Sequence, residues 1–350
     1  MSGTFGTKHV HIVLGGGAVL LLLAAQPAAA AITGACSSCH TMHNSLNGAA
    51  INTPANGGLL LDTCAGCHTG AGTDADGLDD TTGAPLVKVT SVPAGNVYAW
   101  LPGGYFYGAA ADETTFHNVD TVKSGATVTP YGWDENVDAN RTAIGANWAT
   151  QLTCAGTYGC HGDSAEADPA AAISGMHHDS SLREFRMLTN IAGTASSDYT
   201  VNNNGYSADT DGAYAGGKKT ISYLCSECHG DFHTAANTVT AGAWVRHPSD
   251  KELTKTSPDA YDTYGTTANA LDYEVPIGTD DLTTYPTLDD LSGDAIAAAR
   301  KFVICLSCHY AHGSNQADLL RFDYTAMIAG TNGAGKGKGC FRCHTAKDAP

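Results

Sequence analysis

The chain has 350 residues and a formal net charge of -17, and charged residues make up only 15% of it, against ~25% in an ordinary globular domain. So acidic a chain is repelled by the phosphates of nucleic acids, which excludes nucleic-acid binding as its main function. Its 41 glycines disfavour long helices, because glycine is a poor helix former.

The N-terminal segment has the pattern of a secretory signal. Lys8 precedes an apolar run over residues 12–25, and the small residues of QPAAAA follow. The run is too short to span a bilayer as a helix, and no second run of this kind follows, so we expect no transmembrane segment. The sequence predicts a signal peptide over residues 1–31 and a single mature domain over 32–350, exported to the cell surface or medium, with the periplasm as the alternative.

Few regular elements are expected beyond this point. Helix signals are found at 36–46, 181–188 and 221–235, and the longest, 288–312, has apolar residues at helical spacing. The segment 85–92 has the composition of a short strand. Long stretches rich in Gly, Asn, Asp and Thr run between these segments and lack the apolar residues needed to build a core.

The cysteines form a regular pattern. All twelve occur in six pairs, and a histidine directly follows each pair. If histidines were placed at random, this would occur with odds on the order of one in a hundred million. Five pairs have the form C-x-x-C-H, and Cys154 and Cys160 have a longer spacing. The pairs and their histidines are Cys36, Cys39 and His40; Cys64, Cys67 and His68; Cys154, Cys160 and His161; Cys225, Cys228 and His229; Cys305, Cys308 and His309; and Cys340, Cys343 and His344.

This pattern is typical of covalent c-type haem attachment. Two nearby thiols form thioethers to the haem vinyl groups, and the adjacent imidazole becomes an axial ligand of the iron. Zinc sites would combine two cysteine pairs per metal, and disulfides would need no histidine, so neither alternative explains the six histidines. The sequence therefore predicts six covalently bound c-type haems, with the irregular third motif the least specific.

A second set of histidines can supply the opposite axial ligands. Once residues 1–31 are set aside, seven histidines remain outside the motifs, and His177 and His178 are adjacent. We expect one of these two, His178, to be a ligand. The predicted distal ligands are His43, His117, His178, His233, His247 and His312.

Two imidazoles on every iron leave no open coordination position, which indicates electron transfer and not catalysis. A multihaem reductase, the alternative from another class, would need an iron without a sixth ligand. His43, His233 and His312 lie only three or four residues after a motif histidine. On a helix such offsets place both side chains on one face, so each of the three is expected to reach the haem of another motif. The predicted fold is mostly irregular coil with a few short α-helices and little β-structure, wrapped around a chain of six haems.

The motif order resembles that of a known family, the hexahaem outer-membrane c-type cytochromes that polymerise into extracellular electron-conducting filaments. The resemblance is carried by CSSCHTMHNSL at 36–46, CSECHGDFH at 225–233, CLSCHYAH at 305–312 and CFRCHTAKD at 340–348. It implies a head-to-tail homopolymer in which His43 ligates a haem of the neighbouring subunit, the one held by Cys305, Cys308 and His309. Other electron-transfer cytochromes would be the further partners. A monomeric periplasmic or surface carrier with the same haems is the alternative.

Overall fold

The computed structural model describes most of the chain after residue 34, and every structural statement below refers to the described residues. The predicted signal peptide and His247 lie outside them. The described ranges are 35–53, 58–71, 77–80, 82–93, 101–107, 114–123, 129–133, 144, 148, 150–179, 182, 184–196, 203–233, 249–253, 264, 272–292, 301–330 and 338–344.

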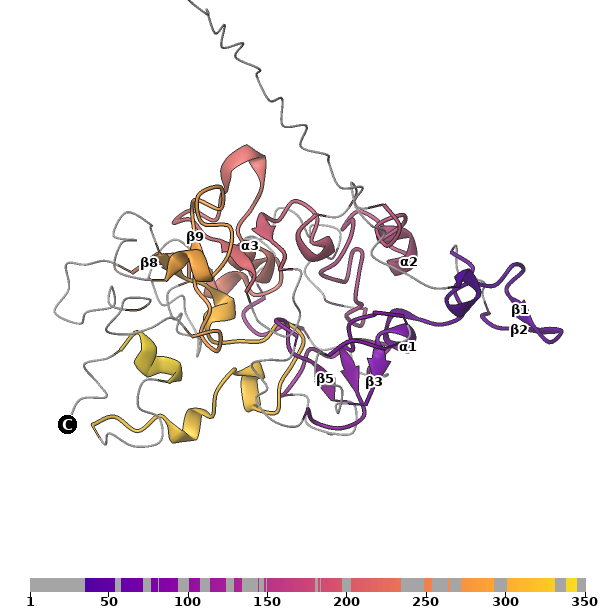
Figure 1. The fold of residues 1–350 in the computed structure, drawn as a ribbon, viewed down its shortest axis with the longest axis horizontal. Helices are drawn as coiled ribbons and strands as arrows, with labels where there is room; N and C mark the ends of the chain where they lie inside the picture. Colours follow the sequence, from indigo (N-terminus) through magenta and orange to yellow (C-terminus); the bar gives the residue numbers. More distant parts are fainter. Residues whose placement is uncertain are drawn as a thin grey trace, which may run out of the picture.

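Irregular backbone dominates these residues, and the helices are short (Figure 1). The α-helices are α1 (Cys64–Cys67), α2 (Pro169–Ala172) and α3 (Ile221–Ser226). The predicted fold class, mostly coil with a few short helices and little β-structure, is thereby confirmed. The remaining helical segments are single 3₁₀ turns at Cys36–Ser38, Phe185–Met187, Ala215–Gly217, Gly230–Phe232, Asp289–Leu291, Cys305–Ser307, Ala317–Leu319, Tyr324–Ala326 and Gly339–Arg342.

Helix α3 shows how local sequence and packing set these elements. Thr220 caps its N-terminus by accepting a hydrogen bond from the Tyr223 N–H, which satisfies one of the free donors of the first turn. Ile221 and Ser222 are buried, and the Ser222 hydroxyl accepts a 3.2 Å bond from the Cys305 N–H. The fourth cysteine motif is therefore fixed directly against the fifth.

The main hydrophobic core surrounds a five-stranded sheet of order β6-β7-β9-β10-β8. Its central residue, Phe302, has no exposed surface and lies opposite both Gly278 and Glu252. Full burial of such a side chain contributes about 1.5–3 kcal/mol to folding. The strands are β6 (Gly193–Thr194), β7 (Gly205–Ser207), β8 (Lys251–Glu252), β9 (Gly278–Thr279) and β10 (Lys301–Val303), and all pairs are antiparallel except β7 with β9.

A smaller parallel sheet follows the second motif. It contains β3 (Thr69–Gly70), β4 (Lys88–Val89) and β5 (Phe106–Tyr107) in sequence order. The predicted strand at 85–92 is confirmed as β4, although it is only two residues long. Beside β5, the Tyr105 N–H donates a 3.0 Å bond to the Gly313 carbonyl, which joins this sheet to the chain after the fifth motif.

Residues 35–53, called the arm below, project from one end of the molecule (Figure 1). A hairpin of β1 (Ser45–Leu46) and β2 (Ala49–Ala50) closes through Asn47 and Gly48, both with positive φ, as the tight turns of two-residue hairpins require. No residue of the arm is buried. The arm therefore offers its side chains to whatever lies beyond the subunit.

Two helix predictions failed where tertiary pairing overrides a helical pattern. In the predicted helix 288–312, residues 301–303 form β10, which pairs with strands on both sides, while 293–300 lie outside the described residues. In 36–46 the helical turn ends at Ser38, because Thr41 donates its N–H to the Leu59 carbonyl and draws the chain into an extended pairing.

The other two helix predictions hold in part. Within 181–188 the described residues include the 3₁₀ turn Phe185–Met187, and positive φ at Arg186 breaks this turn. In 221–235 helix α3 and the turn Gly230–Phe232 are present but separate. No helix among the described residues combines the length and the hydropathy needed to cross a membrane.

Candidate haem-ligand sites

Each cysteine motif closes into the same compact turn. In every one the histidine N–H bonds to the carbonyl of the first cysteine, at 2.9 to 3.1 Å. The irregular third motif makes this bond too, from His161 to Cys154 at 3.0 Å. Its longer loop therefore brings the second thiol and the imidazole back to the positions they have in a C-x-x-C-H turn.

Glycine makes the longer loop of the third motif possible. Gly156 has φ +82, and a Cβ there would lie 2.5 Å from the Glu166 carbonyl oxygen. Only glycine is free of both penalties. The Gly156 N–H bonds back to the His161 carbonyl at 3.0 Å, so the extra residues fold onto the motif.

The imidazoles are oriented by backbone carbonyls. A carbonyl can only accept, so each Nδ1 below carries the proton and donates it, and each Nε2 keeps its lone pair for a metal. Such an outer contact fixes the ring of a ligating histidine. The bonds run from His40 to Gly58 (2.8 Å), His68 to Pro85 (2.9 Å), His117 to Ala311 (2.7 Å), His161 to Arg186 (3.0 Å), His229 to Tyr131 (2.7 Å), His309 to Asp318 (2.7 Å) and His312 to Gly104 (3.3 Å).

Four motif histidines each face a histidine from outside the motifs. The ring centroids are 6.0 to 6.2 Å apart in every case, and the planes are inclined by 31° to 52°. These four imidazole pairs are His40 with His178, His68 with His177, His229 with His117, and His161 with His312.

This separation fits an iron between the two rings. With metal–nitrogen bonds of about 2.0–2.1 Å and about 1.1 Å from each ring nitrogen to its centroid, two axial imidazoles have centroids about 6.3 Å apart. An ordinary aromatic contact can also have this distance. Ordinary ring contacts in this structure reach similar distances, for example 6.1 Å between Phe185 and Tyr206. The four pairs differ from them in composition, because each joins one motif histidine to one histidine from elsewhere. The residues present therefore fit bis-histidine haem ligation.

Burial keeps five of the paired imidazoles neutral. It is the main cause that lowers the pKa of His117 to about 4 and that of His312 to about 3, and the partner imidazoles His229 and His161 lower them further. Burial also lowers the pKa of His68, His161 and His229. Neutral imidazole is the form that binds a metal, so these rings are ready to ligate at neutral pH.

The pair His177 and His178 was predicted to hold one ligand, His178, and one surplus histidine. The structure instead directs the two side chains to different motifs, His178 to His40 and His177 to His68. The turn explains this, because Gly175 has φ +78 and accepts the His178 N–H at 3.0 Å. In such an irregular turn consecutive side chains diverge.

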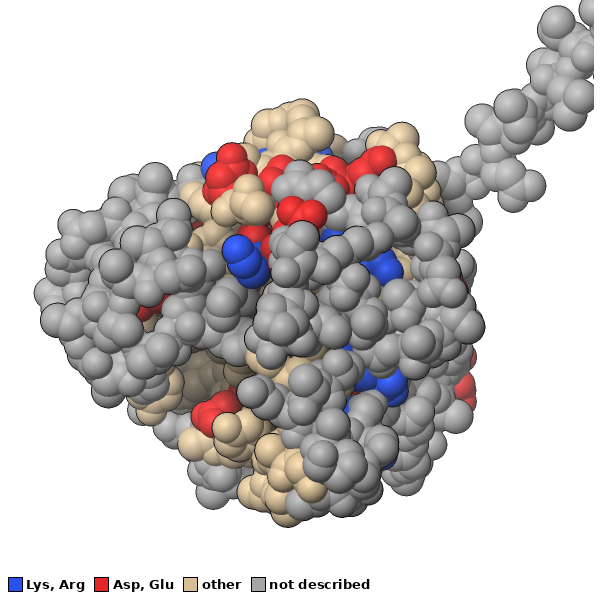
Figure 2. Space-filling model, turned by 90° about the vertical axis from the view of Figure 1, so that its left-hand side faces the viewer, with Lys and Arg blue, Asp and Glu red and all other residues tan. Residues whose placement is uncertain are grey.

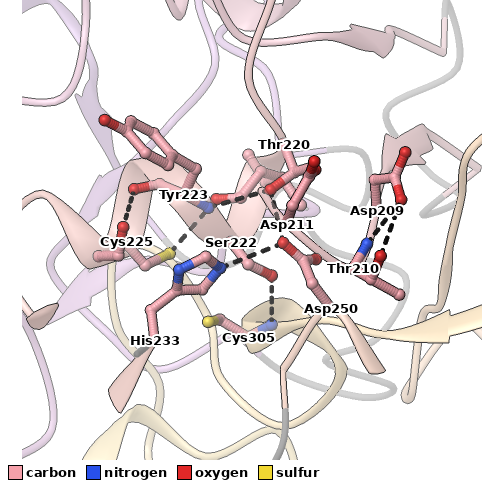
Figure 3. A network of polar contacts seen from close by, with 12 residues as sticks. Asp209, Thr210, Asp211, Thr220, Ser222, Tyr223, Cys225, His233, Asp250 and Cys305 are labelled. Carbon is pink, nitrogen blue, oxygen red and sulfur yellow. Dashed lines mark hydrogen bonds and ion pairs between the residues drawn. The ribbon is translucent and has the colours of Figure 1, made fainter. Parts of the chain in front are cut away.

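His233, one of the predicted distal ligands, lies in a different environment (Figure 3). Its Nε2, the nitrogen that a metal would need, is 3.2 Å from the buried carboxylate of Asp250. The same carboxylate oxygen accepts a 2.6 Å bond from Thr220, the residue that caps α3. His233 and Asp250 thus join the start of α3 to the segment before β8, and in this geometry His233 faces no motif histidine.

His43 and His309 are both exposed. His43 lies on the arm, and no described residue is its hydrogen-bond or ring partner. His309 is the single exposed histidine among the six of the motifs, all of which are described. His312, three residues after His309, faces His161, as the offset argument requires, although the backbone there is not helical.

The thiols of successive motifs meet in two places. Cys64 hydrogen-bonds to Cys154, and Cys225 to Cys305, so the second and third attachment sites are neighbours, as are the fourth and fifth. All twelve cysteines, each of them described, are free thiols. Burial raises the pKa of Cys308 and of Cys343 to about 12, whereas the hydrogen bonds with Cys154 and Cys225 lower the pKa of Cys64 and of Cys305 to about 7.

The motifs and the paired imidazoles are similar to those of multihaem c-type cytochromes, and residues 296–349 match the family model of the doubled CXXCH motif. The chain is similar to C-type cytochrome OmcS of Geobacter sulfurreducens, with 27% identity over 82% of this chain and 78% of the relative. This relative confirms the resemblance predicted from the motif order.

Two solved structures are similar as well. They are titled as an Outer Membrane Cytochrome S filament and as OmcS nanowires, both from Geobacter sulfurreducens. Their sequence identities are 20% and 21%, and their TM-scores are 0.43 and 0.45, over 91% of this chain and 93% of each of theirs.

Proposed function

We propose that this protein is an exported hexahaem electron carrier that assembles head to tail into an extracellular filament. The observation that carries the electron-transfer proposal is the set of four imidazole pairs. The two thiols of each motif would hold one haem covalently, including Cys154 and Cys160 of the third. With bis-imidazole ligation, each haem supplies a one-electron iron couple without an open coordination position.

Backbone carbonyls and neighbouring thiols would position the imidazoles and the haems. Carbonyls hold the Nδ1 atoms, which would keep the rings in a fixed orientation toward a bound haem iron. The thiol contacts between the second and third motifs and between the fourth and fifth motifs would place successive haems side by side. These contacts would allow electrons to pass between the haems of each of these two pairs, and other electron-transfer cytochromes would donate electrons to the chain or accept them from it.

The proposed distal ligands differ from the predicted set at one position. Four motif histidines already face a partner ring, which belongs to His117, His177, His178 or His312. His233 instead contacts Asp250. His177 therefore replaces His233 in the set. His43 and His247 remain for the haems of the fifth and sixth motifs.

The assembly proposal concerns His43. It sits three residues after His40 on an arm that extends from the body (Figure 1). His309 is exposed at the fifth motif, and the resemblance to the filament-forming cytochromes implies that the ligand from the neighbouring subunit reaches the haem of this motif. We assign His43 of one copy to the haem of Cys305, Cys308 and His309 in the next, and His247 to the haem of His344. The repeated contact would be head to tail and open, which produces a filament.

Substituting His43 tests this assignment. His43→Ala should give a folded protein with six haems, one of them high-spin, and no filaments, since each interface loses a metal bond. His233→Ala is the matched control, because it removes a histidine that ligates no iron, and it should form filaments and stay low-spin. Wild-type protein that remains monomeric at every concentration with six low-spin haems would contradict the filament and place His43 on a haem of its own chain.

A further inference from the structure

The arm carries apolar side chains that its own subunit leaves uncovered. Met42 is 82% exposed and Leu46 59% exposed, and they flank His43. No Asp, Glu, Lys or Arg occurs from residue 32 to residue 61. At the chain's average of 15% charged residues, a stretch of this length would contain four or five. An extended, uncharged segment with large exposed apolar groups is typical of a surface that another molecule covers.

A second surface of the same kind follows the fifth motif. Tyr324 is 66% exposed and Ile328 58% exposed, and these two residues form what is called the tail surface below. Residues 324–335 again contain no Asp, Glu, Lys or Arg. The strand-like pairing of His309 with Leu320 and the bond from His309 Nδ1 to the Asp318 carbonyl connect this segment closely to the exposed histidine of the fifth motif.

The two surfaces lie at opposite ends of the molecule. In Figure 1 the arm projects at the right-hand end of the longest axis, and the segments after residue 310, gold and yellow, lie at the lower left. Two different patches at opposite ends cannot meet within one subunit. Between copies they can meet in an antiparallel two-fold dimer, which closes, or head to tail, which leaves one patch free at each end and continues as a filament. The arm projects away from the body along the longest axis (Figure 1), which favours the head-to-tail contact.

Charge favours a second copy as the occupant. Each copy has a net charge of -17, and acidic side chains gather along the upper edge of the face shown in Figure 2. Like charges in direct contact repel, whereas charges beyond about 8–10 Å are screened at physiological salt. Copies of so acidic a protein can therefore associate best through surfaces that carry no charge, and the arm and the tail surface are two such surfaces.

We infer that Met42 and Leu46 of one copy pack on Tyr324 and Ile328 of the next, and that this docking delivers His43 to the exposed His309. The inference rests on the proposed filament and adds the apolar surface that holds it together. The apolar contact sets which copy and which face are joined, and the metal bond then locks the contact.

Two interface variants with His43 intact test this pairing. The arm variant is Met42→Glu with Leu46→Glu, and the tail variant is Tyr324→Glu with Ile328→Glu. All four side chains are largely exposed, so folding and haem load, checked by intact mass, should be unchanged. Val92→Glu, at a residue 37% exposed after strand β4 and in neither surface, is the control and should polymerise like the wild type.

Analytical ultracentrifugation and electron microscopy should find each variant alone monomeric. An equimolar mixture should give a one-to-one heterodimer and no filaments, because the intact arm of one variant fits the intact tail of the other and no further contact is possible. Filaments from either variant alone, or a mixture that stays monomeric, would overturn the inference. If these variants polymerise while His43→Ala does not, the proposed function stands without this surface. A monomeric wild type would overturn both.

Discussion

Replacing Arg321 by methionine should destabilise the region around the fifth motif. Arg321 is only 2% exposed. Its guanidinium donates to the carbonyls of Leu306 (2.6 Å), His309 (3.1 Å) and Pro102 (3.0 Å) and lies 4.1 Å from the centroid of the Tyr310 ring. No carboxylate among the described residues forms an ion pair with it, so these contacts alone compensate its burial.

The magnitude follows from these contacts. Each hydrogen bond from a charged donor contributes about 1.5–3 kcal/mol, and the contact with the ring adds about 0.5–2 kcal/mol. Removing the charge returns several kcal/mol of desolvation cost. Because methionine also fills part of the space, we expect a net loss of about 2–4 kcal/mol in the free energy of unfolding.

Guanidinium denaturation followed by Soret circular dichroism measures this loss, provided that haem load and denaturant slope are unchanged. Arg321→Lys keeps the charge but not the planar fork, so it should lose less. Lys251→Met, at an exposed position of β8, should change stability by less than about 0.5 kcal/mol. If Arg321→Met is as stable as Lys251→Met, the three carbonyl contacts do not hold this region together.

Three further predictions concern the ligands and their supports. His177→Ala should convert one iron of six to a high-spin form that binds carbon monoxide, seen by resonance Raman spectroscopy, and a fully low-spin variant would show that His177 is not a ligand. Cys160→Ser should leave the third haem with a single thioether and one unreacted vinyl group, so that part of the alkaline pyridine haemochrome band shifts to longer wavelength, and an unchanged band would mean that the third motif carries no haem. Gly104→Ala should lower the thermal midpoint of the protein by several degrees, because the new Cβ would lie 2.1 Å from the Gly313 carbonyl oxygen at a backbone with positive φ, and an unchanged midpoint would contradict that contact.

The turn at each cysteine motif could be predicted from sequence because it is local. The histidine N–H bonds to the carbonyl of the first cysteine at every motif. Even the loop between Cys154 and Cys160 closes the same histidine-to-cysteine bond as the regular motifs. The irregular fold class could also be predicted from sequence, since long polar segments cannot form a hydrophobic core of their own.

Sequence alone could not predict which histidine faces each motif histidine, because this depends on long-range packing. Counting gave seven histidines for six positions but no means to choose among them. Adjacent His177 and His178 suggested redundancy, and only the turn at Gly175 separates them. His233 is set apart by Asp250, seventeen residues further along the chain. The helix predicted around Phe302 was wrong for the same reason, because the backbone there pairs with β8 on one side and β9 on the other.

Cryo-electron imaging of the purified native protein, at a resolution that places the irons, tests the central claim most directly. The account predicts six covalent haems in each subunit, with an iron inside each of the four imidazole pairs and with His43 of the neighbouring subunit on the haem of His309. A map in which any of the four pairs encloses no iron, or in which an iron has an open axial position, would contradict it.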